Sequence, residues 1–237
     1  LYLNSSALDV AGHHPDPETR QAAAERAELL TPISKAWCTD VGVEMASLGI
    51  QVHGGYGYIE ETGAAQHLRD ARISPIYEGT NGIQAIDLVG RKLSLRAGGV
   101  MGDLLDEIAA IDGALEEAGD DFASIRSNLA DGLAAFREAT AWIIANGVDD
   151  PNEALAAATP YLKMFGQVVG GWLLARLALG ARRRLAEGVG DTAHLEGKIV
   201  AARFYAEQLL PVARAQLGAV TAGAGDLFAI SADGFSA

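Results

Sequence analysis

The segment Tyr77-Glu78-Gly79-Thr80 places a carboxylate immediately before a predicted helix, where an anion would be stabilised. Pro75 disfavours helix at Ser74, so the chain reaches Glu78 in an extended form, and Thr80 is a residue type that caps helices. The free N–H groups at a helix start stabilise an anion, either Glu78 itself or a bound phosphate or enolate-like oxygen. Spacing alone does not distinguish a base at this place from an ordinary acidic residue near a helix start.

The other candidate groups favour structure over chemistry. The five histidines show no metal-ligand spacing on one helix face, so no metal site is expected, and no serine–histidine pair supports hydrolysis. The single cysteine, Cys38, excludes an internal disulfide and fits a reducing compartment, for which we expect a cytoplasmic location. The basic run Arg182 to Arg184 is typical of a solvated helix end. The strip of Gly166, Gly170 and Gly171 indicates close helix packing.

Composition excludes one class of partner. The 237 residues hold 18 Lys and Arg against 31 Asp and Glu, a net charge of −13, which disfavours nucleic acid. The most apolar stretch, 164–175, is shorter than the ~18 residues typical of a membrane span, so none is expected. The chain starts at Leu1 without a signal-like segment, and we expect that it begins inside a longer protein.

Helical periodicity dominates the sequence and predicts an all-α fold. In the first part, the proline, glycine and capping residues divide the chain into five predicted segments. These are a helix over 16–49, kinked or restarted at Thr31-Pro32; a glycine-rich loop over 51–62; a helix to Arg72 capped by Thr62; an extended segment to Gly79; and a helix to Leu93 capped by Thr80.

After Gly98-Gly99 the sequence changes to four long amphipathic stretches with short connections. This pattern predicts an up-down helical bundle. They cover about 101–118, 121–146, 152–187 and 192–222. Pro160 and Pro211 are expected to bend two of these helices or delay their start. Trp37, Trp142 and Trp172 are expected to anchor the core. We therefore predict two domains, 1–97 and 98–237.

Residues 38–93 closely resemble the C-terminal helical domain of flavin-dependent acyl-CoA dehydrogenases. The resemblance rests on three segments in the family's order and spacing, QVHGGYGY, RDAR and IYEGTNGIQ. It implies that Glu78 is the catalytic base, which removes a proton from the α-carbon of an acyl-CoA. The hydride then leaves the β-carbon for FAD, giving a trans-2-enoyl-CoA. It further implies that the Glu78 N–H and a ribityl hydroxyl of FAD polarise the thioester carbonyl.

The resemblance also assigns binding residues by position. It implies that Gln51, Gly54 and Gly55 contact the FAD of a neighbouring subunit, and that Thr80 and Asn81 contact the flavin from the helix start. Tyr77 and Gly79, together with Glu78, are implied to bind the substrate; a packing role for Tyr77 stays open. Many relatives carry a glutamine at the position of Gly82. The flavin contact that this glutamine would make is therefore in question here.

The second half resembles the extra C-terminal helical domain of one subfamily, through the apolar patterns PYLKMFGQVVGGWLLARLAL and FYAEQLLPVARAQLGAVTAG. This second match assigns no chemistry, and we expect the domain to stabilise a dimer or to shape the pocket. The family resemblance as a whole implies a homodimer or homotetramer and an electron-transfer flavoprotein as electron acceptor. The family's N-terminal helical and middle β domains are not visible, so we expect this chain alone to hold FAD weakly or not at all. The alternative is a non-catalytic helical dimerisation module derived from the same family.

Overall fold

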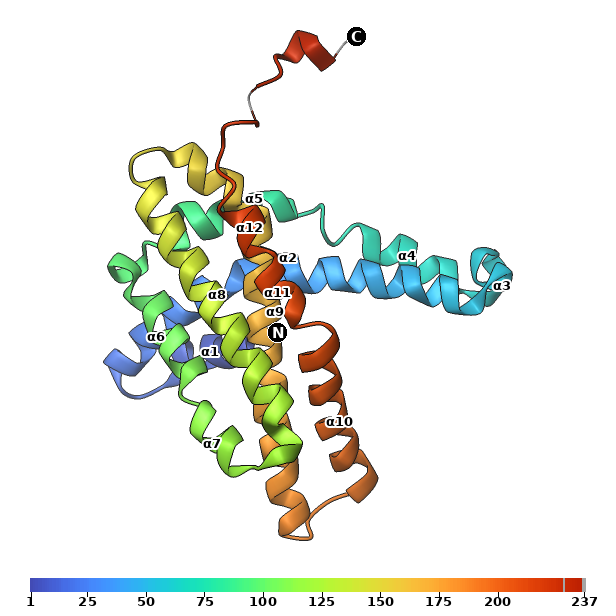
Figure 1. The fold of residues 1–237 in the computed structure, drawn as a ribbon. Helices are drawn as coiled ribbons and strands as arrows, with labels where there is room; N and C mark the ends of the chain where they lie inside the picture. The colour runs from blue at the N-terminus through green and yellow to red at the C-terminus, as the bar shows by residue number, and fades with distance from the viewer. Residues whose placement is uncertain (228, 236–237) are drawn as a thin grey trace. The chain divides into compact units, whose positions relative to one another are not determined.

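The computed structural model describes residues 1–227 and 229–235, and within these residues it contains helices and no strand (Figure 1). The all-α prediction is confirmed. The chain divides into two compact units, Leu1–Val100 and Met101–Ala237. The predicted boundary between residues 97 and 98 stays a prediction.

The first unit is organised around one long helix, α2 (Pro17–His53). The helix α1, the short helix α4 and the helix α5 all pack on it. The elements in chain order are α1 (Tyr2–His13), α2, α3 (Gly55–Tyr58), the 3₁₀ turn η1 (Glu60–Thr62), α4 (Ala64–Arg72), α5 (Asn81–Asp87), the π-helical turn η2 (Leu88–Lys92) and the 3₁₀ turn η3 (Leu95–Gly98).

The start of α2 is fixed by its sequence. The Asp16 carboxylate accepts a hydrogen bond from the Thr19 N–H at 2.9 Å, and Pro17 occupies the first helical position, where its missing N–H has no consequence. The helix then continues through the buried Pro32 without a restart, although proline removes one internal hydrogen bond. Burial of apolar side chains on this stretch outweighs the local preference.

Several local predictions for the first unit are wrong. Gln51 to His53 complete α2 where a loop was expected. Thr62 does not cap α4, because its hydroxyl donates to the carbonyls of Tyr56 and Ile59. Gly63, with φ 75°, takes the capping position. Residues 73–79 form turns and bends in place of the expected extended segment.

The second unit is built around the helix α9 (Pro151–Ala186), which packs against α8 (Ala123–Gly147) on one side and α10 (Thr192–Gln208) on another. Asp150 and Asp191 cap α9 and α10 by accepting hydrogen bonds from backbone N–H groups. The remaining elements are α6 (Gly99–Ala109), α7 (Asp112–Glu117), the 3₁₀ turn η4 (Asp120–Phe122), α11 (Pro211–Ala215), α12 (Leu217–Val220) and the 3₁₀ turn η5 (Ala232–Phe235).

The two prolines of the predicted bundle act differently. The stretch that we expected to run as one helix over 192–222 is interrupted: α10 ends at Gln208, and Pro211 begins the separate short helix α11. Pro160 lies inside α9 in its third turn and does not delay the start of the helix. By length and composition, α9 is also apolar enough to cross a membrane. In its most apolar 18-residue stretch, 56% is buried inside the structure. Burial of this kind is typical of a core helix.

The core of the second unit contains an aromatic cluster. The Phe136 ring lies 5.3 Å from that of Tyr161 and 5.0 Å from that of Phe165, between centroids. The Tyr161 and Thr140 hydroxyls share a hydrogen bond of 2.8 Å, so both buried polar groups are satisfied.

The three tryptophans expected to anchor the core differ in burial. Trp172 is 1% exposed, whereas Trp37 and Trp142 are only half-buried. Trp172 is therefore the one fully enclosed anchor of the three.

Gly170 and Gly171, two of the three glycines in the predicted strip on α9, serve close packing as predicted. A Cβ at Gly170 would lie 2.8 Å from the Tyr205 hydroxyl, and a Cβ at Gly171 would lie 2.9 Å from a Leu210 methyl group. These glycines therefore let α10 and the residues after it approach the α9 backbone.

Tyr205 gives this packing an alkaline pH dependence. Burial raises the pKa of Tyr205 to about 12, and its hydroxyl donates to the Gln167 carbonyl at 3.0 Å. Since the folded-state pKa lies above the ordinary value of about 10, the folded state binds the proton more tightly. The stabilisation is complete below about pH 10 and is lost as the pH rises through about 12.

The unfolding free energy of the wild type is expected to fall as the pH rises from about 10 to about 12. In Tyr205→Phe we expect this fall to be smaller by about 1–3 kcal/mol. Urea unfolding followed by circular dichroism at several alkaline pH values measures that fall. An identical fall in the wild type and the variant would show that Tyr205 does not couple folding to its proton.

Candidate functional site

The Glu78 segment forms a tight turn in a backbone conformation that most side chains avoid. Glu78 has φ 53° and Gly79 has φ 84°, so two consecutive residues are left-handed. The Asn81 N–H donates to the Pro75 carbonyl at 3.1 Å and closes the turn. A left-handed conformation costs a non-glycine residue roughly 1–2 kcal/mol, and it persists only where the surrounding structure holds it.

Helix α5 begins directly after this turn. The Thr80 hydroxyl accepts a hydrogen bond from the Ile83 N–H at 3.4 Å, so Thr80 caps the helix as the sequence predicts. The cap fixes where the helix starts, and the turn therefore presents Glu78 shortly before the first helical residue, Asn81.

A polar network attaches the turn to α2. The Lys35 ammonium donates to the Gly79 carbonyl at 2.7 Å and to the Asn81 side-chain oxygen at 2.8 Å. The Asn81 amide nitrogen lies 2.7 Å from an Asp40 carboxylate oxygen and 3.0 Å from the Thr39 hydroxyl. It also lies 3.0 Å from a backbone carbonyl of α2. Both ends of the Asn81 side chain are engaged within the chain, and its contact with a cofactor stays a prediction.

Sequence reasoning missed this network. Lys35 and Thr39 lie four positions apart on α2, which is the spacing of neighbours on a helix surface, and Asp40 follows directly. That spacing was the available signal. Their partner, Asn81, is more than forty positions away in the sequence, so the pairing itself could not be inferred from local pattern.

The Glu78 turn is open to solvent in this chain. Glu78, Gly79 and Thr80 are exposed, and Tyr77 is 51% exposed. Ile83, in the first turn of α5, is also an exposed large apolar residue. The segment that carries this carboxylate thus also carries exposed apolar side chains, an arrangement typical of a surface that another protein element or a ligand covers.

The second group of predicted residues lies at the far end of α2. Gln51, Gly54 and Gly55 are all exposed. A Cβ added at Gly54 or Gly55 would meet nothing within 4 Å, so the chain's own packing does not require either glycine to lack a side chain. Gly54 is favoured by its φ of 61°, but Gly55 has no such reason. The space above Gly55 is therefore available to a group from outside the chain.

The structure does not bring the two groups together. Lys35 anchors the Glu78 turn, and Gln51 lies sixteen positions further along the same helix. At 1.5 Å per residue this places the two groups about 24 Å apart along α2. Figure 1 shows α3 at the distal end of α2, away from α5. One chain therefore presents two separate half-sites.

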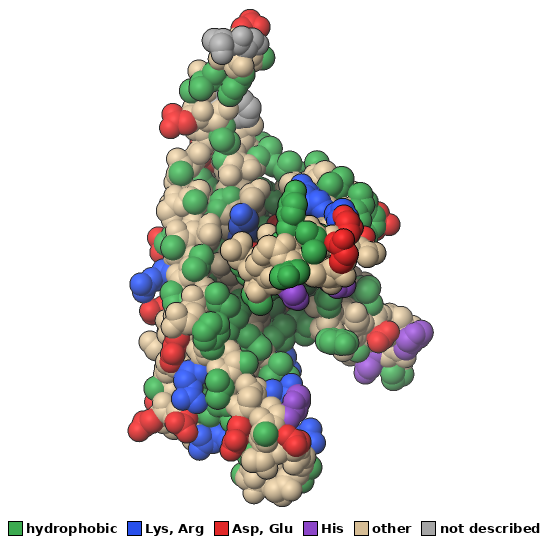
Figure 2. All heavy atoms as spheres, turned by 90° about the vertical axis from the view of Figure 1, so that its right-hand side faces the viewer, with side chains coloured by type: hydrophobic (Ala, Val, Ile, Leu, Met, Phe, Trp, Pro, Cys, Tyr) green, Lys and Arg blue, Asp and Glu red, His purple; other side chains and the backbone are tan. Residues whose placement is uncertain are grey.

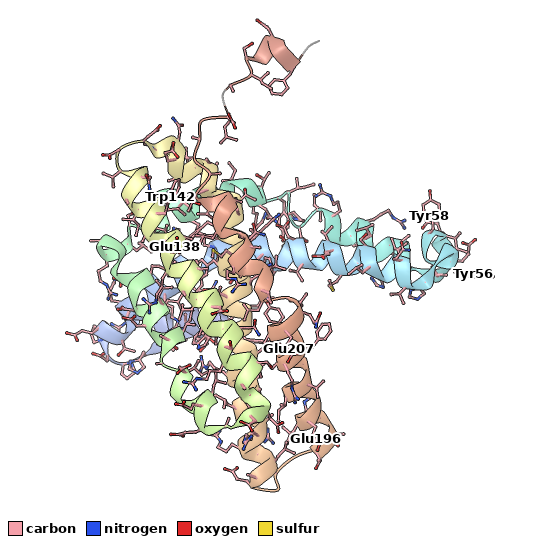
Figure 3. The ribbon with its side chains drawn as sticks, viewed as in Figure 1. Tyr56, Tyr58, Glu138, Trp142, Glu196 and Glu207 are labelled. Atoms are coloured by element: carbon pink, nitrogen blue, oxygen red, sulfur yellow. The ribbon has the colours of Figure 1, made fainter. Side chains whose placement is uncertain are left out.

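The distal part of α2 together with α3 and α4, residues 44–72, forms an arm. Its tip carries exposed apolar side chains, with Val52 85%, Tyr56 74% and Tyr58 80% exposed. Figure 3 shows both labelled tyrosines at the tip, directed away from α2, and Figure 2 shows hydrophobic side chains beside charged ones on the face that it views. Such exposure indicates that another surface covers the arm in an assembled protein.

Gly57 and Gly55 in the arm differ in what they do. A Cβ at Gly57 would overlap the Ile50 carbonyl oxygen and lie 2.8 Å from the His53 Cβ, whereas a Cβ at Gly55 meets nothing. We expect Gly57→Ala to destabilise the α2–α3 turn by about 1–3 kcal/mol and Gly55→Ala to leave it folded. Hydrogen exchange of residues 50–62, read by mass spectrometry, measures the difference. Equal exchange in the two variants would contradict this distinction.

Metal chemistry has no visible support in the part of the chain that the structure describes. Across residues 1–227 and 229–235, no group of three or more His, Cys, Asp or Glu side chains is placed to hold a metal ion.

Comparison with known families identifies the class. The model described as "Acyl-CoA dehydrogenase, C-terminal domain" matches residues 17–94, which include the Glu78 turn and the arm. The model described as "Acetyl-CoA dehydrogenase C-terminal like" matches residues 104–231, more than half of the chain. The chain belongs to the acyl-CoA dehydrogenase family, and the resemblance inferred from its motifs is confirmed.

Individual relatives agree with this assignment. The chain is 44% identical over 90% of its length to 3-methylmercaptopropionyl-CoA dehydrogenase of Ruegeria pomeroyi, of which it covers 36%. It is 30% identical over 89% of its length to a butyryl-CoA dehydrogenase of Syntrophomonas wolfei, of which it covers 35%. A broad-specificity linear acyl-CoA dehydrogenase, FadE5 of Mycobacterium tuberculosis, is 29% identical over 78% of the chain, which covers 31% of it. The chain thus spans about a third of these relatives.

Proposed function

We propose that this chain is the C-terminal part of an FAD-dependent acyl-CoA dehydrogenase, in which Glu78 removes the α-proton of an acyl-CoA thioester to yield a trans-2-enoyl-CoA. The observation that carries the proposal is the Glu78 turn. Glu78 lies in a left-handed turn that hydrogen bonds tie to α2, and the apolar side chains of Tyr77 and Ile83 on the same segment are exposed.

This arrangement suits the removal of a weakly acidic proton. An α C–H is a poor acid, so its base must be aligned with it and kept away from water. The closed turn supplies the alignment, and Tyr77 and Ile83 supply apolar surface against which an acyl group and a covering domain can pack. We assign Tyr77 and Gly79 to the substrate side of the turn. The Glu78 N–H is assigned to the thioester oxygen, where a fixed donor stabilises developing negative charge.

The residues present fit a flavin dinucleotide. Gly55 leaves open space that no neighbouring atom fills, and a Cβ at Gly82 would meet only the Thr80 hydroxyl, at 3.8 Å. We propose that Thr80 contacts the cofactor at the Glu78 turn, with Asn81 beside it, and that Gln51, Gly54 and Gly55 contact it at the arm. When bound, FAD supplies the hydride acceptor of the reaction.

The separation of the two half-sites supports a homo-oligomer. Residues about 24 Å apart along one helix are poorly placed to grip the same region of one cofactor. We propose that the arm reaches the cofactor of a neighbouring subunit while the Glu78 turn serves its own, in a dimer or a tetramer. The exposed apolar tip of the arm is consistent with burial in such an interface.

The proposed enzyme is larger than this chain. Because the chain spans about a third of its relatives and Glu78 is exposed, we propose that the chain alone is inactive and holds FAD weakly. We call the polypeptide that joins it to the missing N-terminal helical and middle β domains the complete flavoprotein. We propose an electron-transfer flavoprotein as its electron acceptor. Short, long, branched, aromatic and sulfur-containing acyl groups all remain candidate substrates.

The second candidate function is a non-catalytic dimerisation module. It is favoured by the exposed apolar side chains on the arm and by Val200 and Phe204, which are exposed one turn apart on α10. A module of this kind needs the apolar surfaces but has no use for a carboxylate held in a strained turn.

Product analysis separates the two functions. The complete flavoprotein is incubated with a panel of acyl-CoA thioesters and an artificial electron acceptor, and the thioesters are examined by mass spectrometry. An acyl-CoA dehydrogenase yields a thioester that has lost two hydrogens, with a trans double bond between the α- and β-carbons. A dimerisation module leaves every thioester unchanged.

A further inference from the structure

The Lys35 network is placed to control the Glu78 turn from outside the reacting groups. Lys35 contacts both sides of the peptide segment that follows Glu78, the Gly79 carbonyl at 2.7 Å and the Asn81 side chain at 2.8 Å. Gly79 is bonded directly to Glu78, so a contact that fixes the Gly79 carbonyl restrains the backbone next to Glu78. Lys35 is therefore one residue removed from the proposed base.

The network supplies what the strained turn lacks by itself. Hydrogen bonds within residues 73–81 close the loop but do not fix its orientation on α2. Lys35 ties the turn to α2, and so do the bonds of the Asn81 amide to Thr39, to Asp40 and to the Ala36 carbonyl. The side chains of this network are all half-buried: Lys35, Thr39, Asp40 and Asn81. In the contact with Gly79 the charged Lys35 ammonium is the donor, which makes the hydrogen bond a strong one. Charge-assisted bonds in partly buried sites resist exchange with water better than exposed ones.

We propose that Lys35 is a positioning residue for Glu78 and that Asp40 supports it through Asn81. The inference rests on the proposed function, because it gives the network a purpose in proton removal. Lys35 keeps the left-handed turn oriented so that the Glu78 carboxylate meets the α-carbon. It makes no contact with the substrate in this role. A misplacement of about 1 Å in a reacting group can lower a rate by about 100-fold, so a small rotation of the turn is sufficient to matter.

The test compares Lys35→Met with Lys163→Met in the complete flavoprotein. Methionine keeps an unbranched side chain but removes the ammonium donor. Lys163 is an exposed lysine on α9 in the second unit, so the same substitution there controls for loss of a charge. Two readouts are used: hydrogen exchange of peptides that cover residues 76–81, and steady-state kinetics with an acyl-CoA substrate. Flavin content and circular dichroism establish that each variant is folded and loaded.

For Lys35→Met we expect exchange at the turn to rise about tenfold and kcat to fall about 10- to 100-fold, with KM changed less than about twofold. Lys35→Arg, which retains a cationic donor, is expected to recover part of kcat. Lys163→Met changes neither readout. Unchanged exchange at the turn in Lys35→Met overturns the proposal, and so does faster exchange with an unchanged kcat.

A second variant covers the case in which Lys35→Met does not fold. Thr39→Val keeps the side-chain shape and removes the hydroxyl that lies 3.0 Å from the Asn81 amide nitrogen. It is expected to loosen the turn by a smaller factor, and an unchanged turn in this variant counts against the network. Failure of the proposed function itself has another signature, since Glu78→Gln would then leave product formation unaffected while the turn still responded to Lys35.

Discussion

Glu78→Gln is expected to reduce the rate of flavin reduction by an acyl-CoA by about 10³-fold or more in the complete flavoprotein. Glutamine has nearly the same shape and can occupy the same turn, but its amide cannot accept a proton from carbon. General acid–base groups contribute roughly 10²- to 10⁴-fold to enzymatic rates, and no other carboxylate belongs to the described turn over residues 73–81. Anaerobic stopped-flow absorbance in the flavin band measures the rate.

Glu78→Asp is the matched control for this prediction. It keeps the carboxylate but withdraws it by one methylene group, so the base remains and its alignment suffers. We expect a rate between those of the wild type and Glu78→Gln. Circular dichroism and flavin content should be equal in all three proteins. A Glu78→Gln variant that reduces its flavin as fast as the wild type would remove Glu78 from the chemistry.

Trp172→Ala is expected to destabilise the second unit by about 3–5 kcal/mol, the range observed when a large aromatic side chain is removed from a core. Trp172 lies in α9 and is 1% exposed. Its removal leaves a cavity that the long, packed helix cannot close easily. Because the unfolding free energy of a domain is only about 5–15 kcal/mol, this loss is a large fraction of the total. Urea unfolding of the 237-residue chain, followed by circular dichroism, measures it.

Trp142→Ala provides the comparison on a neighbouring helix. Trp142 lies on α8, where Figure 3 labels it, and is half-buried. The same truncation there removes less buried surface, so we expect a smaller destabilisation, about 1–2 kcal/mol. If both variants lost equal stability, the different burial of the two tryptophans would not determine how much each stabilises the second unit.

Much of the helical fold could be predicted because its signals are local. Asp16 with Pro17 defines the start of α2, and Thr80 caps α5, each by a hydrogen bond within three residues. Pro211 begins α11 for another local reason, because the first position of a helix tolerates the missing N–H of proline. Other predictions failed because a competing interaction was stronger than the expected one. The helix does not restart at Pro32, which is buried inside α2. Thr62 does not cap α4, because its hydroxyl donates to the carbonyls of Tyr56 and Ile59.

The site could be predicted only in part, because its residue types are local and its arrangement is not. Glu78 and the glycines of the arm were found from motifs, but the left-handed turn at Glu78 has no signal in residue type, since glutamate rarely adopts it. The Lys35–Asn81 contact joins residues on two elements and emerges only when α5 packs on α2. The distance between the two half-sites likewise follows from α2 continuing to His53, where a loop was expected from Gln51.

The central claim, that this chain belongs to a flavin-dependent acyl-CoA dehydrogenase, is tested most directly by the visible spectrum of the complete flavoprotein before and after anaerobic addition of an acyl-CoA. We predict an oxidised flavin band at one FAD per subunit that bleaches on addition of a suitable thioester. The 237-residue chain alone should show no such band. A complete polypeptide that purifies without flavin, or whose flavin band is unchanged by every acyl-CoA tested, would contradict the account.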